Sequence, residues 1–218
     1  MKTNVRKLTT LAMLAALAYI VMATIKIPFF PAYEFFKYEP KDVIITIGGF
    51  IYGPLASLAI SLVVSFAEAL TVSTTGPVGM MMNVIATVSF ACTATYIYKR
   101  DRTLKGALKG LIVGCITLTA SMVAWNYIVT PGYMKVPRDV VEGMLIPVII
   151  PFNLLKGVLN STIIVLIYKP VVEALRKMNF IQKAGNDEKR RFNLGLALAA
   201  ALVLATCVFL VLVIKGII

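Results

Sequence analysis

The sequence contains no histidine, and this absence removes the commonest metal ligand and general base found in proteins. Its three cysteines, Cys92, Cys115 and Cys207, lie in separate apolar stretches without metal-binding or disulfide spacing, which is typical of small core residues. The sequence also lacks a GxxxxGK(S/T) phosphate-binding loop, paired catalytic carboxylates and a Ser–His pair. It therefore predicts a protein that is not an enzyme, holds no metal or cofactor, and cannot hydrolyse ATP through such a loop.

Charged residues are scarce as well, at 15% of the 218 residues, whereas 59% are hydrophobic and the mean hydropathy is +0.87. A soluble domain of this size cannot bury so much apolar surface, so we expect the chain to lie in a lipid bilayer. A transmembrane helix needs about 20 mainly apolar residues. Runs of this kind occur at 8–27, 43–72, 78–98, 104–129, 152–167 and 192–214.

The run at 43–72 fits either one tilted helix or two helices joined at Gly53-Pro54. Cytoplasmic loops of membrane proteins collect Lys and Arg. The basic segments at the N-terminus, at 99–109 and at 169–191 all fall on one side only if the run breaks at Gly53-Pro54. Glycine eases a tight corner and proline interrupts a helix, so we favour the break.

The resulting topology has six spans with a cytoplasmic N-terminus, and a seventh span that ends outside. Its second span, at 41–52, is short and is tolerable only if it packs inside the bundle. The triplet Ala16-Leu17-Ala18 resembles a signal-peptide cleavage site, but the run stays apolar beyond it, which favours a span. The net charge of +12 follows from the basic inner loops, and it predicts membrane lipid rather than nucleic acid as a partner.

This topology gathers the unusual segments on the outer side. Segment 28–42 carries six aromatic residues within ten positions and three prolines. It fits a lid or an interfacial aromatic belt, and the prolines and alternating charges favour the lid. Segment 71–78 is small and polar, and it is either a ligand-binding turn or a tight connection. Segment 130–151 is rich in proline and is expected to form an external or re-entrant cap.

Polar side chains lie near the outer ends of the spans. Asn126 can donate and accept hydrogen bonds, or can be an interfacial amide. Asn153 and Lys156 share a helix face and point either into the bundle or towards headgroups, where a lysine can snorkel. Glu68 can pair with a buried cation. Together these features predict an externally open pocket with aromatic walls, several amides and few charges, suited to a planar, mostly uncharged heterocycle.

Ala12 and Ala16 form an AxxxA pattern in the first span, and Ala23 extends the same face. Small residues four apart let helices approach closely in lipid. The pattern fits either packing within this bundle or docking of another membrane protein.

Four stretches together resemble the substrate-binding (S) components of energy-coupling factor (ECF) vitamin transporters, specifically the riboflavin-specific ones. They are the AxxxA pattern, YEPKDVIITIGGFIYGP (38–54), SFAEALTVSTTGPVG (65–79) and PFNLLKG (151–157). The last three are fairly specific in this order, and the resemblance covers about residues 5–177. It implies an all-α integral membrane protein of the plasma membrane, with a six-helix substrate-binding bundle.

The expected organisation is a six-helix domain at 1–177, a basic cytoplasmic linker at 178–191 and an additional C-terminal transmembrane helix at 192–218. The additional helix departs from the family pattern. The resemblance implies that riboflavin is bound as a substrate and not as a cofactor. The predicted substrate-binding residues are Asn126, Asn153, Lys156, Thr75, Gly76, Phe36, Tyr38 and Lys41.

The resemblance further implies that Ala12 and Ala16 dock a transmembrane coupling protein, which carries two ATPase subunits. Three rival functions stay open at this point. An S component for another vitamin is the first. Binding of a cationic vitamin would require acidic side chains or an aromatic cage at the pocket. An autonomous secondary transporter usually shows inverted repeats and ionisable residues near the midplane, which we do not see here. A membrane enzyme is disfavoured by the missing catalytic sets.

Overall fold

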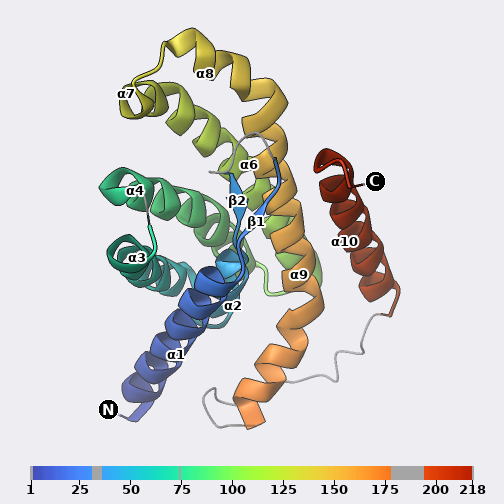
Figure 1. The fold of residues 1–218 in the computed structure, drawn as a ribbon. Coiled ribbons are helices and arrows are strands. Elements are labelled where there is room, and N and C mark those ends of the chain that lie inside the picture. The colour runs from blue at the N-terminus through green and yellow to red at the C-terminus, as the bar shows by residue number, and fades with distance from the viewer. Residues whose placement is uncertain (1, 31–35, 74, 178–193, 218) are drawn as a thin grey trace.

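The computed structural model describes residues 2–30, 36–73, 75–177 and 194–217, and these are almost entirely helical (Figure 1). Within the described residues, six helices are long and apolar enough to cross a membrane. They are Val5–Thr24, Pro54–Thr71, Gly76–Arg100, Leu104–Ile128, Arg138–Leu175 and Gly195–Ile214. This confirms the predicted all-α integral membrane fold. The predicted linker at 178–191 lies outside the described residues.

Helix α1 (Lys2–Thr24) is followed by a small antiparallel hairpin of β1 (Ile27–Pro28) and β2 (Lys37–Tyr38). Ile27 pairs with Tyr38 across the hairpin. The chain then enters α2 (Lys41–Tyr52), which is the short second helix that the sequence predicted.

The break at Gly53-Pro54 is confirmed. Helix α2 ends at Tyr52, Gly53 adopts φ 94°, and α3 (Pro54–Thr71) begins with proline at its first position. Only glycine adopts such a φ at little cost, and proline is well tolerated at a helix start, so the two residues make a sharp corner. Ten of the twelve residues of α2 are buried, which confirms that this short helix packs inside the bundle.

The next span combines α4 (Gly76–Thr87), a π-helical turn η1 (Val88–Cys92) and α5 (Thr93–Arg100). It packs closely against α6 (Leu104–Ile128) because α6 presents glycine at the contact. A Cβ atom at Gly110 would lie 2.5 Å from the carbonyl oxygen of Ala94, and one at Gly114 would lie 2.8 Å from that of Phe90. The two helix backbones therefore touch, as small residues permit in lipid.

After the short helices α7 (Thr130–Met134) and α8 (Arg138–Met144), a second π-helical turn, η2 (Leu145–Ile149), leads directly into α9 (Ile150–Lys177). The sequence predicted a cap at 130–151, separate from a span at 152–167. This prediction is wrong for the second half of the cap, because residues 138–151 form one continuous helix with the span. The helix continues past Pro147 because the wider π-turn accommodates a residue that cannot donate its backbone hydrogen bond.

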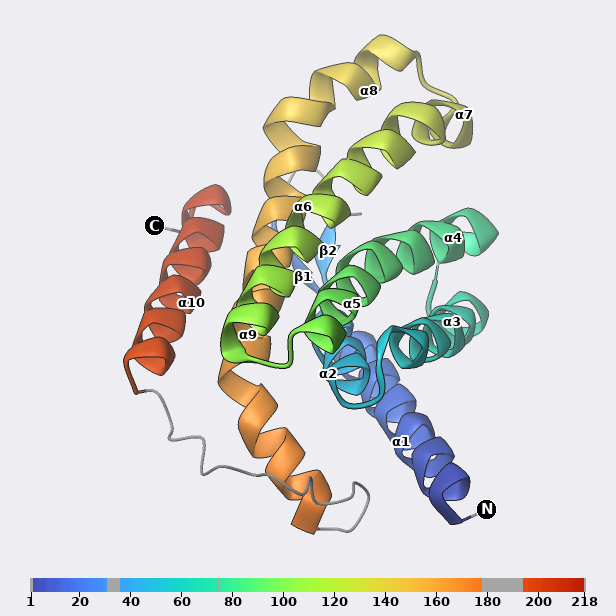
Figure 2. The same ribbon diagram turned by 180° about the vertical axis from the view of Figure 1, so that it is seen from behind.

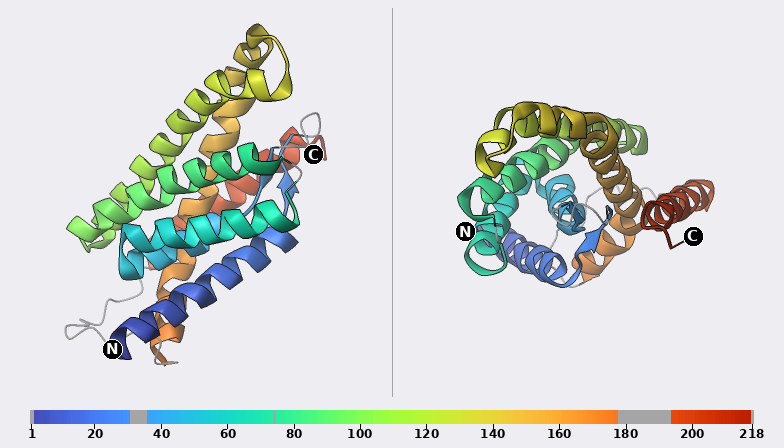
Figure 3. Two further views of the ribbon diagram at one scale, coloured as in Figure 1. Left: turned by 90° about the vertical axis from the view of Figure 1, so that its left-hand side faces the viewer. Right: turned by 45° about the horizontal axis from the view of Figure 1, so that its top comes forward.

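Helix α10 (Leu194–Ile214) packs along α9 at the edge of the bundle (Figures 1 and 2). The left view of Figure 3 separates the two ends of the bundle. The N-terminus, the α2–α3 corner and the α5–α6 turn lie at one end, and the hairpin and the α3–α4 connection lie at the other. Within the described residues, the basic N-terminal segment and the basic α5–α6 turn thus lie at the opposite end of the bundle from the hairpin.

Candidate substrate-binding site

The first turn of α2 places two charged side chains inside the protein. Lys41 is 1% exposed and Asp42 is 0% exposed. An ion in a low-dielectric interior loses several kcal/mol of solvation, so each needs partners. Lys41 Nζ lies 3.0 Å from Glu39 Oε2 and 2.5 Å from Glu68 Oε2. Two carboxylates therefore hold this ammonium group.

Glu68 of α3 carries the interaction onward to α4. Its Oε1 atom accepts a hydrogen bond of 2.9 Å from Nδ2 of Asn83. Lys26, after α1, lies 3.9 Å from Glu39 on the other side of the cluster. The buried cation that we expected as the partner of Glu68 is thus Lys41, and this first network connects α2, α3 and α4.

A second network surrounds Asp42. Its Oδ1 atom accepts a hydrogen bond of 2.7 Å from the hydroxyl of Thr87 in α4. Its Oδ2 atom lies 3.2 Å from Lys156 Nζ and 3.4 Å from Nδ2 of Asn160, both in α9. The hydroxyl of Tyr38 donates a hydrogen bond of 2.9 Å to Oδ1 of Asn160. This network connects β2, α2, α4 and α9.

Tyr38 is kept in its protonated form by this environment. Burial raises the pKa of its phenol, and the negative charge of Asp42 raises it further. The hydroxyl consequently remains a hydrogen-bond donor to Asn160 over the whole range of physiological pH.

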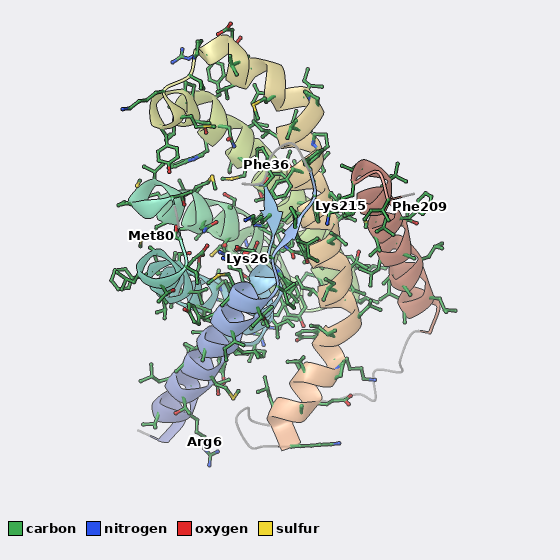
Figure 4. The ribbon with its side chains drawn as sticks, in the orientation of Figure 1. Arg6, Lys26, Phe36, Met80, Phe209 and Lys215 are labelled. Atoms are coloured by element: carbon green, nitrogen blue, oxygen red, sulfur yellow. The ribbon has the colours of Figure 1, made fainter. Side chains whose placement is uncertain are left out.

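Aromatic rings cover the same end of the bundle. Phe29 and Tyr38 stack with ring centroids 5.5 Å apart and an interplanar angle of 16°. Phe152 of α9 meets Phe29 at 5.5 Å and Phe36 at 5.0 Å. We call these four residues the aromatic wall. Figure 4 shows Phe36 beside the hairpin, and Phe29, Phe36 and Tyr38 are all buried. Tyr33 and Phe35 of the same segment lie outside the described residues.

The two predicted amides are buried but are not part of the charged networks. Asn126 of α6 is 6% exposed, donates to the carbonyl of Met122 and accepts from Thr130. Asn153 of α9 is 4% exposed and donates to the carbonyl of Ile149. A side-chain amide has two N–H donors, so each can still donate to a ligand.

Thr75 and Gly76 lie apart from this cluster, at the start of α4, and both are half-buried. The carbonyl of Thr75 accepts a hydrogen bond of 3.3 Å from Tyr133 in α7. Gly76 has φ 60°. Thr75 forms hydrogen bonds with Ser73 and Tyr133, and neither of these residues belongs to the two charged networks.

The structure therefore brings Phe36, Tyr38, Lys41 and Lys156 together, with Asn153 one helical turn before Lys156. Sequence reasoning missed Asp42, Thr87, Asn83 and Asn160, and it expected few charges where the structure has several. Asn160 lies within an apolar run, and polar side chains in such runs generally mark functional sites. That signal could have identified Asn160.

On α1, the side chains of Ala12 and Ala16 are exposed, whereas Leu14, Ala15 and Ala18 are buried. The AxxxA face thus points away from the bundle. Packing within this chain, the first of the two readings offered by the sequence, does not account for it.

These features define a multi-pass membrane protein with a candidate small-molecule site, polar and aromatic, at one end of a helical bundle. Residues 6–168 match the substrate-specific component of ECF transporters. The chain belongs to this family. The match ends before α10.

Individual relatives agree with this assignment. The chain is 32% identical to the riboflavin transporter RibU of Staphylococcus aureus, over 79% of this chain and 94% of that protein. It is 27% identical to the riboflavin transporter FmnP of Bacillus subtilis, over 79% of this chain and 97% of that protein. A solved structure of the S component of a bacterial ECF transporter superposes with a TM-score of 0.67 at 32% identity, covering 79% of this chain and 99% of that one.

Proposed function

We propose that this protein captures riboflavin at the external face of the plasma membrane and delivers it inward together with an ATP-driven ECF coupling complex. The observation that carries the proposal is the meeting of the aromatic wall with the Lys156–Asp42 network at one end of the bundle. The names of the two relatives above point to the same vitamin. The role is one of binding and carriage, without covalent chemistry.

The side chains of the site suit the parts of riboflavin. The flat, apolar face of its ring system packs against aromatic side chains. The edge of the ring system alternates hydrogen-bond acceptors and a donor, which Asn126 and Asn153 can complement. The ribityl hydroxyls can accept hydrogen bonds from Lys156. Because Asp42 already neutralises Lys156, a bound ligand need not bring a negative charge.

The buried acids also argue against a cationic vitamin. Glu68 and Asp42 are both buried, and each faces a lysine within 3.2 Å. A cationic ligand would have to displace one of these lysines from a desolvated position, and this would leave a buried charge without its partner. The paired acids therefore favour a neutral heterocycle over a thiamine-like one.

Riboflavin titration is the direct test. We expect the purified protein to quench flavin fluorescence on binding, and bound flavin to quench Trp125, the only tryptophan, which adjoins Asn126. At a riboflavin concentration about 100 times Kd, the protein should gain about 2.7 kcal/mol of stability. Unchanged emission from both fluorophores and an unchanged melting temperature would refute riboflavin as the ligand. Thiamine in place of riboflavin serves as the control ligand.

For the partner, we propose that Ala12 and Ala16 dock the transmembrane coupling protein, whose two ATPase subunits supply the energy. Their small side chains face outward and permit close helix approach in lipid. In this arrangement the N-terminus and the basic segments lie in the cytoplasm, and the hairpin lies outside, in agreement with the distribution of Lys and Arg.

The variant Ala16→Trp tests this docking face. The indole would hold the partner helix away, so we expect riboflavin uptake with the coupling complex to fall at least about tenfold, or 1.4 kcal/mol, with riboflavin binding unchanged. Ile112→Trp is the matched control, since Ile112 is 62% exposed on α6, away from the AxxxA face. Normal uptake by Ala16→Trp would assign this face to lipid.

A further inference from the structure

Helix α10 turns one stripe of residues towards the rest of the protein. Ala200, Cys207 and Val211 are buried, and Leu204 is partly buried. Their spacing of three, four and seven places them on one helix face. Phe209 is 53% exposed and points away from α9 (Figure 4). The helix thus has a packed side and a lipid-facing side, although it lies beyond the residues that match the family.

The packed stripe reaches the aromatic wall. Cys207 and Val211 belong to the same buried cluster as Phe29, Phe36, Tyr38 and Phe152. The right view of Figure 3 places α10 next to α9 on the side of the bundle where the hairpin lies.

The hairpin needs such support. Each of its strands has two residues, and an isolated two-stranded hairpin is at best marginally stable. Lipid tails are as apolar as the α10 side chains, so packing α10 against this buried cluster gains little hydrophobic free energy. The gain is close packing, which fixes the positions of the rings in a way that fluid acyl chains cannot.

We propose that α10 is a positioning element for the aromatic wall, with the stripe of Leu204, Cys207 and Val211 holding the wall against α9 so that a bound ligand is released slowly. The proposal rests on riboflavin as the ligand of this site. It adds a role for a helix outside the part of the chain that defines the family.

Cys207→Phe in the full-length chain is the main test. The larger side chain would displace the wall, so we expect riboflavin to dissociate about tenfold faster, with an association rate changed less than about twofold. The control is Phe209→Leu on the lipid-facing side. Riboflavin should dissociate from this variant at the same rate as from the unaltered protein. Stopped-flow flavin fluorescence gives both rates. If Cys207→Phe releases riboflavin at the unaltered rate, α10 does not position the wall.

Should Cys207→Phe fail to fold, Val211→Ala removes packing from the same stripe without adding bulk, and we expect about threefold faster release. Unaltered release from Val211→Ala would overturn the proposal. An independent measurement uses Cys92→Ala/Cys115→Ala, in which Cys207 is the remaining thiol. Bound riboflavin should slow its alkylation by N-ethylmaleimide, because coupling between two sites is reciprocal. Equal alkylation rates with and without riboflavin would contradict the coupling.

These outcomes are separable from those of the proposed function. If the unaltered protein does not bind riboflavin, the proposed function fails and no release rate exists to compare. If the unaltered protein binds riboflavin and the stripe variants release it normally, only the role of α10 fails.

Discussion

Replacing Asp42 by Asn is expected to lower the free energy of unfolding by about 3–5 kcal/mol, because it leaves Lys156 buried without its counter-ion. The single variant Lys156→Met should lower the free energy of unfolding by a similar amount, since it leaves the buried carboxylate of Asp42 without its counter-ion. In the double variant Asp42→Asn/Lys156→Met, no uncompensated charge remains, and much of the lost stability should return. Denaturation of the four proteins in detergent gives the coupling free energy of the pair.

The surface pair of Lys169 and Glu173 is the control for this cycle. Their side chains are 44% and 55% exposed and lie four residues apart on α9. Glu173→Gln should change stability by no more than about 0.5 kcal/mol. Additive effects of the two buried substitutions would contradict the pairing. Riboflavin binding distinguishes a loss of folding from damage to the binding site. The double variant should be folded and should still bind the vitamin weakly.

Gly110→Leu is expected to destabilise the protein by about 3 kcal/mol, at the upper end of the cost of overpacking. The new Cβ atom would meet the carbonyl oxygen of Ala94 at 2.5 Å, and backbone atoms cannot move aside as a flexible side chain can. Helices α5 and α6 would have to separate. The melting temperature in detergent measures the loss.

Gly143→Leu is the matched control, for which we expect no loss of stability. A Cβ atom at Gly143, in α8, would meet nothing within 4 Å. Leucine has a higher helix propensity than glycine by up to about 1 kcal/mol, so this variant should be unchanged or slightly more stable. Equal effects at the two positions would mean that close backbone contact at Gly110 contributes nothing.

The sequence was sufficient for features that depend on local chemistry and on charge distribution. The Gly53-Pro54 corner could be predicted because glycine and proline limit the backbone directly. The separation of basic and aromatic segments followed from the hydrophobic runs and from the positions of Lys and Arg. Lys156 stood out because a lysine near the start of an apolar run is unusual.

Features that depend on distant partners were not predictable in this way. Asp42 lies at the boundary between the aromatic segment and an apolar run, where a carboxylate is ordinarily solvated. Its complete burial results from contacts with Thr87, Lys156 and Asn160, far along the chain. The close approach at Gly110 likewise depends on which helix faces it. The continuous helix through Pro147 escaped prediction because the rule for proline assumes an α-helical turn, not a π-helical one.

The ion pairs around α2 have an electrical consequence for a carrier of a neutral compound. The carboxylates of Glu39, Asp42 and Glu68 are matched in number by the ammonium groups of Lys26, Lys41 and Lys156. An unbalanced elementary charge moved across the bilayer exchanges about 2.3 kcal/mol of work per 100 mV with the membrane potential. A cluster of zero net charge exchanges none, so the voltage across the membrane would neither drive nor oppose its displacement.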